Sequence, residues 1–122
     1  MSAPDISALV AETVDAYGTT TSSPFDTGKV ELRVLNHPAV AEYRGTAAYE
    51  DLQDTVQQQA VQYLGAKTDG EGRRVYFAGR GQRGRYVWYP VRLIHDRANG
   101  DQALLAKLLH ALERQDAEYL AR

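Results

Sequence analysis

The sequence predicts an α+β protein in which helices pack on a small antiparallel sheet. Three observations lead to this prediction. Residues 1–18 and 101–121 repeat apolar side chains at helical spacing. Two β-prone runs flank a glycine-rich loop between residues 74 and 93. Residues 29–64 have the pattern of two short strands and a helix, so the expected core is β-β-α-β-β, with an N-terminal helix before it and a long C-terminal helix after it.

The N-terminal helix is expected over residues 1–18, followed by a linker. Asp5 is suited to cap this helix and Gly18 to end it. Its apolar stripe consists of Ile6, Leu9, Val10, Val14 and Tyr17. Residues 19–28, TTTSSPFDTG, have the composition of a loop or linker. The first helix is therefore expected to be separable from the core at residues 29–122.

Two short strands are expected to open the core. Residues 29–35 alternate between apolar and polar side chains, as a half-buried strand does. The apolar residues of this alternation are Val30, Leu32 and Val34. Residues 36–38, Asn-His-Pro, are a turn signal, and residues 40–44 then supply the second strand.

A helix is expected from Thr46 to about Leu64. Apolar residues recur at helical spacing on one face, and carboxylate and amide side chains fill the other. The apolar face consists of Tyr49, Leu52, Val56, Ala60, Tyr63 and Leu64. Gly65 is suited to the C-terminal cap of this helix.

A β-hairpin is expected next, with strands at 74–78 and 86–93. Both strands are rich in β-branched and aromatic residues, and the glycines between them allow the loop to bend. If Ala78 pairs with Tyr86, then Tyr76 lies opposite Trp88. The other face of the hairpin then points into a core with Phe77, Val87, Tyr89, Val91 and Leu93. Pro90 is expected at an edge or bulge, because it has no N–H to donate.

The C-terminal helix, from Asp101 to about Ala121, has the strongest helical pattern in the chain. Its wide apolar band consists of Leu104, Leu105, Leu108, Leu109, Leu112 and Leu120. A band of this width can pack on a sheet and still leave a surface for a second subunit. We therefore expect Leu104 and Leu108 to take part in self-association.

The length and composition indicate one domain over residues 1–122. A chain of 122 residues with 43% hydrophobic and 25% charged residues is ordinary for a soluble globular protein with a core. It shows no signal-peptide pattern and no apolar run near the roughly 20 residues that span a membrane. With no cysteine in the chain, disulfides and cysteine-ligated metals are excluded, and the expected location is the cytoplasm.

Positive charge is concentrated in the hairpin. Residues 73–92 hold six arginines and no acidic residue, whereas the rest of the chain has 8 basic and 16 acidic residues and carries −8. The candidate residues for binding a partner or a polyanion are Arg74, Tyr76, Arg80, Arg83, Arg85, Tyr86, Trp88 and Arg92. Arginine binds phosphate bidentately and exposed aromatic rings stack on unpaired bases, so nucleic-acid binding is one hypothesis. The alternative is a solvated arginine-rich turn, with Tyr86 and Trp88 in the core.

The sequence offers no constellation typical of an enzyme, a metal site or a cofactor site. The three histidines are His37, His95 and His110. None lies at a metal-ligand spacing from another, so each is expected to be a surface or structural residue. Residues 79–84 match the G-x-G-x-x-G spacing, but that fingerprint opens a helix and here a strand is expected to follow. We therefore expect no enzymatic activity, no metal and no cofactor.

Residues 30–52, VELRVLNHPAVAEYRGTAAYEDL, resemble the opening of the gyrase-inhibitor-like domains, also called AraC-type effector-binding domains. The matching features are the strand at residues 30–32, the return strand at Val40-Ala41, the arginine at Arg44 and the helix start at Tyr49-Glu50. Residues 73–93 would supply two further strands of the family's module. The chain has no second copy of that module, and it has Ala47-Ala48 where the family has Gly-Pro. The resemblance implies a module that binds small molecules or a protein partner.

Together these observations predict a non-enzymatic binding module that engages a protein partner or a small ligand as a homodimer. The alternative is binding of single-stranded nucleic acid or RNA through the hairpin at 73–92. The net charge of −2 counts against this alternative, because nucleic-acid-binding domains are usually basic.

Overall fold

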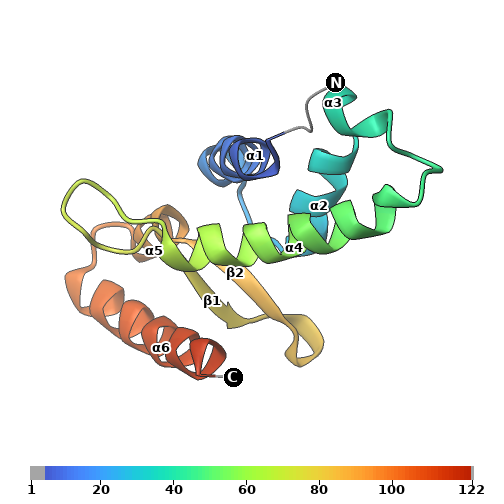
Figure 1. Cartoon of the computed structure of the whole chain (residues 1–122). Coiled ribbons are helices and arrows are strands. Elements are labelled where there is room, and N and C mark those ends of the chain that lie inside the picture. Colours follow the sequence, from blue (N-terminus) through green and yellow to red (C-terminus); the bar gives the residue numbers. More distant parts are fainter. Residues whose placement is uncertain (1–4, 122) are drawn as a thin grey trace. The chain divides into compact units, whose positions relative to one another are not determined.

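The computed structural model (Figure 1) describes residues 5–121, apart from the side chain of Gln82. Its elements are α1 (Ile6–Thr20), α2 (Thr27–Leu35), α3 (Pro38–Ala41), α4 (Ala48–Ala66), β1 (Tyr76–Arg80), a 3₁₀ turn (Gln82–Gly84), β2 (Tyr86–Pro90), α5 (Val91–Ala98) and α6 (Gln102–Leu120). The α+β class, the N-terminal helix and the long C-terminal helix are confirmed. Residues 1–4 of the predicted first helix lie outside the described part of the chain.

The chain divides into two compact units, which are described in turn. The first unit contains α1, α2, α3 and α4 as far as Tyr63. The second contains residues 21–26 and the chain from Leu64 onward, so it holds both strands, α5 and α6. Six residues of the predicted linker therefore belong to the second unit.

In the first unit, small apolar side chains bury one face of each helix. Asp5 caps α1 as predicted, because its Oδ1 accepts a hydrogen bond from the Ala8 N–H at 3.1 Å. The core of this unit includes Ile6, Val10, Val14, Val30, Val34, Val40, Val56 and Ala60. Gly18 and Gly65 were expected to end α1 and α4, but both helices continue past them. Neither glycine adopts the positive φ that makes glycine favourable beyond a helix end.

The prediction of a strand at residues 29–35 is wrong, because these residues lie in the helix α2. Val30 and Val34 are four residues apart, so they share a face in a helix as well as in a strand, and both are buried. Leu32 distinguishes the two structures. In the helix it turns away from the core, and 63% of it is exposed.

The predicted strand at residues 40–44 is also wrong. Pro38 occupies the start of the short helix α3, where its missing N–H costs nothing. The Nδ1 atom of His37 caps this helix by accepting a hydrogen bond from the Ala39 N–H at 3.1 Å. The Asn-His-Pro turn signal therefore marks a helix start, and the β-β half of the expected core is absent from the described residues.

The hairpin is confirmed in the second unit, but its register and length differ from the prediction. Ala78 pairs with Trp88, not with Tyr86, and Tyr76 pairs with Pro90. The second strand ends at Pro90, and Val91 starts the helix α5, so the expected strand over residues 91–93 is wrong. Proline has no N–H for a ladder and its φ suits the entry to a helix, which explains the change at this point.

The position of Gly79 explains why the strand register predicted from the sequence was wrong. The sequence suggested that it belongs to a flexible loop, whereas it lies inside β1 opposite Val87. An added Cβ would be 2.7 Å from Leu112 Cδ1 and 2.8 Å from the Tyr89 ring, so a side chain here would require both of these side chains to move. Gly79 therefore allows α6 to approach the strand closely, and the true tip is the short Gln82–Gly84 turn.

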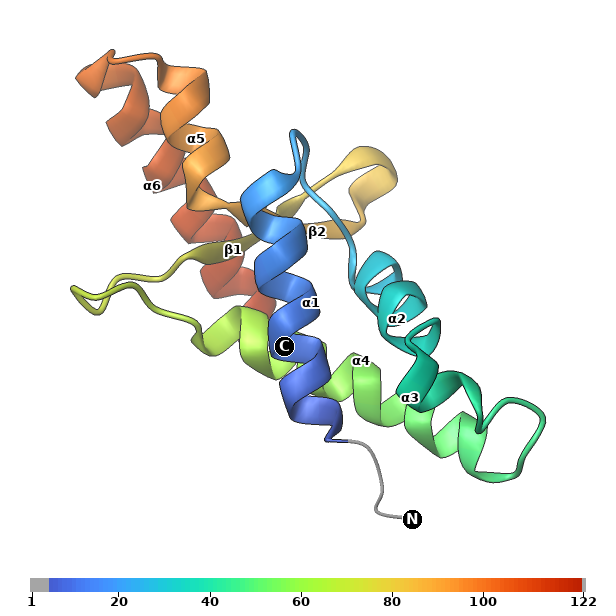
Figure 2. The same cartoon turned by 90° about the horizontal axis from the view of Figure 1, so that it is seen from above.

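Both edges of the two-stranded sheet are covered (Figures 1 and 2). Side chains of α6 accept hydrogen bonds from the outward N–H groups of β1, Asp116 from Ala78 at 2.8 Å and Gln115 from Arg80 at 2.7 Å. On the other edge, Phe25 exchanges backbone hydrogen bonds with Trp88 at 3.1 and 2.7 Å. Neither edge is left as a bare template for pairing with another chain.

Candidate functional site

A pocket of about 560 Å³ opens in the second unit beside α5 and α6. This volume falls in the range of small-molecule sites, roughly 300–1,000 Å³. Apolar side chains supply part of the lining and charged side chains the rest. The lining residues of this α5–α6 pocket are Asp69, Arg73, Arg74, Phe77, Val91, His95, Leu105, Leu109 and Glu113.

A tight turn before β1 forms one wall of the pocket, and Asp69 organises it. The Asp69 Oδ1 accepts hydrogen bonds from the backbone N–H groups of Glu71 at 2.8 Å and Arg73 at 3.0 Å. These backbone N–H groups, together with the Arg73 guanidinium, hold the pKa of Asp69 below its usual value of 3.8. Arg73 also forms ion pairs with Asp69 at 3.4 Å and with Glu71 at 2.5 Å. The charged side chains of Asp69, Glu71 and Arg73 therefore find their partners within the turn itself.

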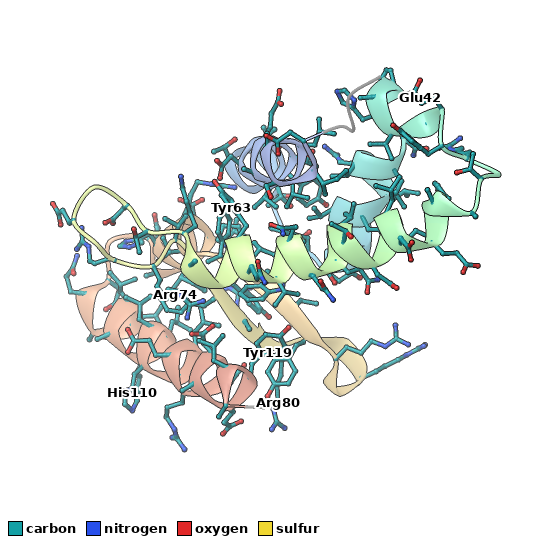
Figure 3. The ribbon with its side chains drawn as sticks, in the orientation of Figure 1. Glu42, Tyr63, Arg74, Arg80, His110 and Tyr119 are labelled. Atoms are coloured by element: carbon teal, nitrogen blue, oxygen red, sulfur yellow. The ribbon has the colours of Figure 1, made fainter. Side chains whose placement is uncertain are left out.

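Arg74 connects this turn to α6 (Figure 3). Its guanidinium forms an ion pair with Asp116 on α6 and donates to the Tyr76 carbonyl at 3.1 Å. It also lies 5.4 Å from the centroid of the Phe77 ring, within the range of a cation–π contact. The Asp116 carboxylate is buried, so the pair fixes the turn, the strand and the helix around the pocket.

The opposite wall consists of the antiparallel helices α5 and α6, which pack side by side (Figure 2). Asn99, in the left-handed conformation, ends α5, and the Asp101 side chain caps α6 by accepting from the Leu104 N–H at 3.0 Å. The Val91 N–H donates to the Val75 carbonyl at 2.8 Å and so ties the start of α5 to the turn. The lining of the pocket thus comes from two helices, a strand and a turn that is held by its own hydrogen bonds.

Two polar side chains of the lining have no partner among the described residues. The His95 imidazole on α5 and the Glu113 carboxylate on α6 form no hydrogen bond or ion pair with any of them. Arg73 and Arg74 both face carboxylates. The polar groups available to a ligand are therefore chiefly the Glu113 carboxylate and the His95 imidazole.

The structure brings only part of the predicted binding residues together. Tyr76 and Trp88 are each only 2% exposed, so they belong to the core and offer no ring for stacking. Tyr86 is half-buried against Tyr119 of α6, with ring centroids 5.0 Å apart. Tyr119 also contacts Trp88 edge-on at 5.5 Å. Tyr86 and Trp88 of the expected aromatic platform are therefore covered by the C-terminal helix, and Tyr76 packs edge-on against Phe25.

The predicted arginines are dispersed. Arg74 lines the pocket, and Arg80 pairs with Glu118 at 3.3 Å. The adjacent Tyr86 hydroxyl and Glu118 carboxylate raise the pKa of Arg80 above its usual value. Arg92 donates to the Thr21 carbonyl at 2.7 Å. The two remaining arginines of the set, Arg83 and Arg85, are exposed at the hairpin tip and form no side-chain hydrogen bond or ion pair with the described residues.

The predicted self-association residues lie on the side of α6 that is not used by the pocket. Leu104 is 38% exposed and Leu108 is half-buried. Leu105 and Leu109, which the sequence placed in the same apolar band, instead line the pocket. The wide band of α6 is thus divided between a pocket stripe and an outer stripe.

Sequence reasoning missed most of the pocket. His95 was expected to be an ordinary surface or structural histidine, and Phe77 and Val91 were expected to be simple core residues. Glu113 was not singled out, although it continues the helical stripe of Leu105 and Leu109 at a four-residue spacing. A carboxylate at the end of a leucine stripe was the available signal.

Comparison of the chain with protein-family models, with curated protein sequences and with solved structures finds no match. The strands implied by the gyrase-inhibitor-like resemblance at residues 30–32 and 40–41 are helical here. No group of three or more His, Cys, Asp and Glu side chains among residues 5–121 is arranged to hold a metal ion. No helix in the same part of the chain is long and apolar enough to cross a bilayer.

Proposed function

We propose that this protein is a non-enzymatic binding module and that the α5–α6 pocket is its site for a small, partly apolar ligand. One observation carries the proposal: a pocket of about 560 Å³ combines an apolar lining with a few polar groups. Binding sites for small molecules are usually concave and mostly apolar, with a small number of placed polar groups.

The rigidity of the walls supports this function. The hydrogen bonds of the Asp69 turn and the Arg74–Asp116 ion pair connect the elements that line the pocket. A pre-formed site loses little conformational entropy on binding, so more of the contact energy appears as affinity. A protein partner would bind the same pocket by inserting an apolar side chain into it.

Ligand titrations observed by NMR test this proposal. The methyl signals of Leu105, Leu109 and Val91 are followed while small aryl and alkyl compounds of each charge are added. Leu109→Trp fills the pocket and is expected to abolish binding, whereas Ala106→Trp, on an exposed turn of the same helix, leaves it unchanged. Binding that persists in Leu109→Trp, or no binding of any compound to the wild type, contradicts the proposal.

Self-association is the second part of the proposed function. Leu104 and Leu108 lie outside the pocket lining, and Leu104 exposes 38% of its surface. A second copy would cover an apolar stripe that otherwise faces water.

Polyanion binding is retained as a second candidate because of the hairpin tip. Arg83 and Arg85 are exposed, and no acidic side chain among the described residues pairs with either. With Tyr76 and Trp88 buried, this candidate depends on phosphate contacts and not on base stacking.

A further inference from the structure

We propose that the α5–α6 pocket selects an organic cation with an apolar body, such as an arylalkylamine, whose ammonium group pairs with Glu113. This inference rests on the proposed function, because it names the chemical class of ligand for the same pocket. It follows from the charges around the pocket, from its apolar floor and from the position of Glu113 on α6.

The charges favour a cation. Arg74 is paired with the buried Asp116, and Arg73 is paired with Asp69 and Glu71. The lining itself holds two carboxylates, Asp69 and Glu113, and two guanidinium groups, so the ion pairs already formed decide which charge is left for a ligand. An anionic ligand would have to compete with existing ion pairs, whereas a cation meets a carboxylate that has no partner among the described residues.

The apolar floor determines the rest of the ligand. Phe77, Leu105 and Leu109 line the pocket together with Val91. These side chains can cover a ring or a short alkyl chain, and each buried CH₂ group contributes about 0.8 kcal/mol. A simple inorganic cation would gain nothing from this surface, so the site suits an amphipathic molecule.

The spacing of residues on α6 places the apolar floor and the Glu113 carboxylate on the same side of the helix. Leu105, Leu109 and Glu113 are spaced four residues apart and therefore lie on one side of the helix. Leu109 and Glu113 are separated by about 6 Å along the helix axis. A ring packed on the two leucines with a two-carbon chain ending in an ammonium group spans this distance.

Three probes with the same apolar body test the inference by NMR titration. They are 2-phenylethylamine, which is cationic, 2-phenylethanol, which is neutral, and 3-phenylpropanoate, which is anionic. A charge-assisted hydrogen bond is about twice as strong as a neutral one. We expect the amine to bind about tenfold more tightly than the alcohol, and the propanoate to bind most weakly.

Matched variants identify the carboxylate. Glu113→Gln keeps the shape of the side chain, so the amine should lose about tenfold in affinity while the alcohol is unaffected. Glu118→Gln is the control, since it lies on the same helix, pairs with Arg80 and does not line the pocket. Both positions are exposed, so neither change should affect folding.

The outcomes separate this inference from the proposed function. Three results would overturn the cation inference: equal affinity of the three probes, preference for the propanoate, or an unchanged amine affinity in Glu113→Gln. In each of these cases the proposal that the pocket binds a small ligand remains valid. Failure of all three probes to shift the Leu105 and Leu109 methyl signals overturns the proposed function and the inference together.

Discussion

The Asp116 carboxylate accepts a hydrogen bond from the backbone N–H of Ala78 at 2.8 Å, so a side chain on α6 takes the place that a third strand would occupy. The same carboxylate forms the ion pair with Arg74. One buried acidic group therefore closes the edge of the sheet, docks the C-terminal helix and fixes one wall of the pocket.

Replacing Asp116 should destabilise the protein strongly. Asp116→Ala leaves the Arg74 guanidinium without its partner and the Ala78 N–H without an acceptor, and breaking a buried ion pair costs about 3–5 kcal/mol. Glu118→Ala, which breaks the exposed pair with Arg80, is the control and should cost at most about 1 kcal/mol. Urea unfolding measures both. Similar losses in the two variants would contradict the role assigned to Asp116.

The Asp69 turn should make stability depend on acid pH. The pKa of Asp69 is lower in the folded protein than the usual value of 3.8, so its contribution is present above about pH 4 and is lost as the pH falls through the folded-state pKa. Asp69→Asn should therefore lower the thermal midpoint at neutral pH and show a smaller further loss in acid. Asp54→Asn, on an exposed part of α4, serves as the control. An identical acid dependence of Asp69→Asn and the wild type would disprove this prediction.

Gly79 should not tolerate a side chain. A Cβ at this position would be 2.7 Å from Leu112 and 2.8 Å from Tyr89, and overpacking of this kind typically costs about 1–3 kcal/mol. Gly70→Ala is the matched control, because nothing lies within 4 Å of its added Cβ. Thermal unfolding compares the two variants. If the clash with Leu112 is the cause, Gly79→Ala should cost less in a Leu112→Ala background than in the wild type, as a double-mutant cycle measures.

Self-association should depend on the outer stripe of α6. Leu104→Glu places a charge at a residue that is 38% exposed, so it should weaken a dimer without unfolding the chain. Leu32→Glu, at a residue of α2 that is 63% exposed, is the control for a general effect of surface charge. Sedimentation velocity over a range of concentrations gives the readout. A wild-type chain that stays monomeric at high concentration would contradict self-association through α6.

The hairpin tip gives the test of polyanion binding. Arg83→Ala combined with Arg85→Ala should change stability by less than about 0.5 kcal/mol per site, because both side chains are exposed. If the tip binds nucleic acid, affinity for an oligonucleotide falls with salt, and the double variant shows a shallower salt slope. Trp88→Ala should instead destabilise the fold by about 3–5 kcal/mol, since Trp88 is 2% exposed. Absence of salt-dependent binding at low ionic strength rejects this candidate.

The fold class, the three helices that became α1, α4 and α6, and the hairpin could be predicted from periodicity and propensity, but several details could not. Val30 and Val34 satisfy the strand period and the helix period equally, and only burial shows that Leu32 lies outside the core. The role of Gly79 depends on Leu112, which is distant in sequence. Local patterns contain no information about such contacts, so the register was shifted.

The candidate site was less predictable than the fold. The density of arginine and aromatic residues in the hairpin indicated a binding surface, but Tyr119 and Asp116 of α6 cover much of it. The pocket is assembled from a turn, a strand and two helices whose proximity arises only from tertiary packing. Periodicity identified the leucines of α6 correctly, but it gave no sign that two of them face a cavity.

The short segment at residues 21–26 determines whether cleavage of the chain can separate the two units. This segment lies between α1 and α2 in the sequence, yet it belongs to the second unit, where Phe25 pairs with Trp88. A fragment beginning at Leu64 would lack Phe25, so the backbone of Trp88 would lose both hydrogen bonds on its outer side. No single peptide-bond cleavage therefore yields two fragments that each contain one complete unit, and fragments divided after Tyr63 would have to reassociate to restore the second one.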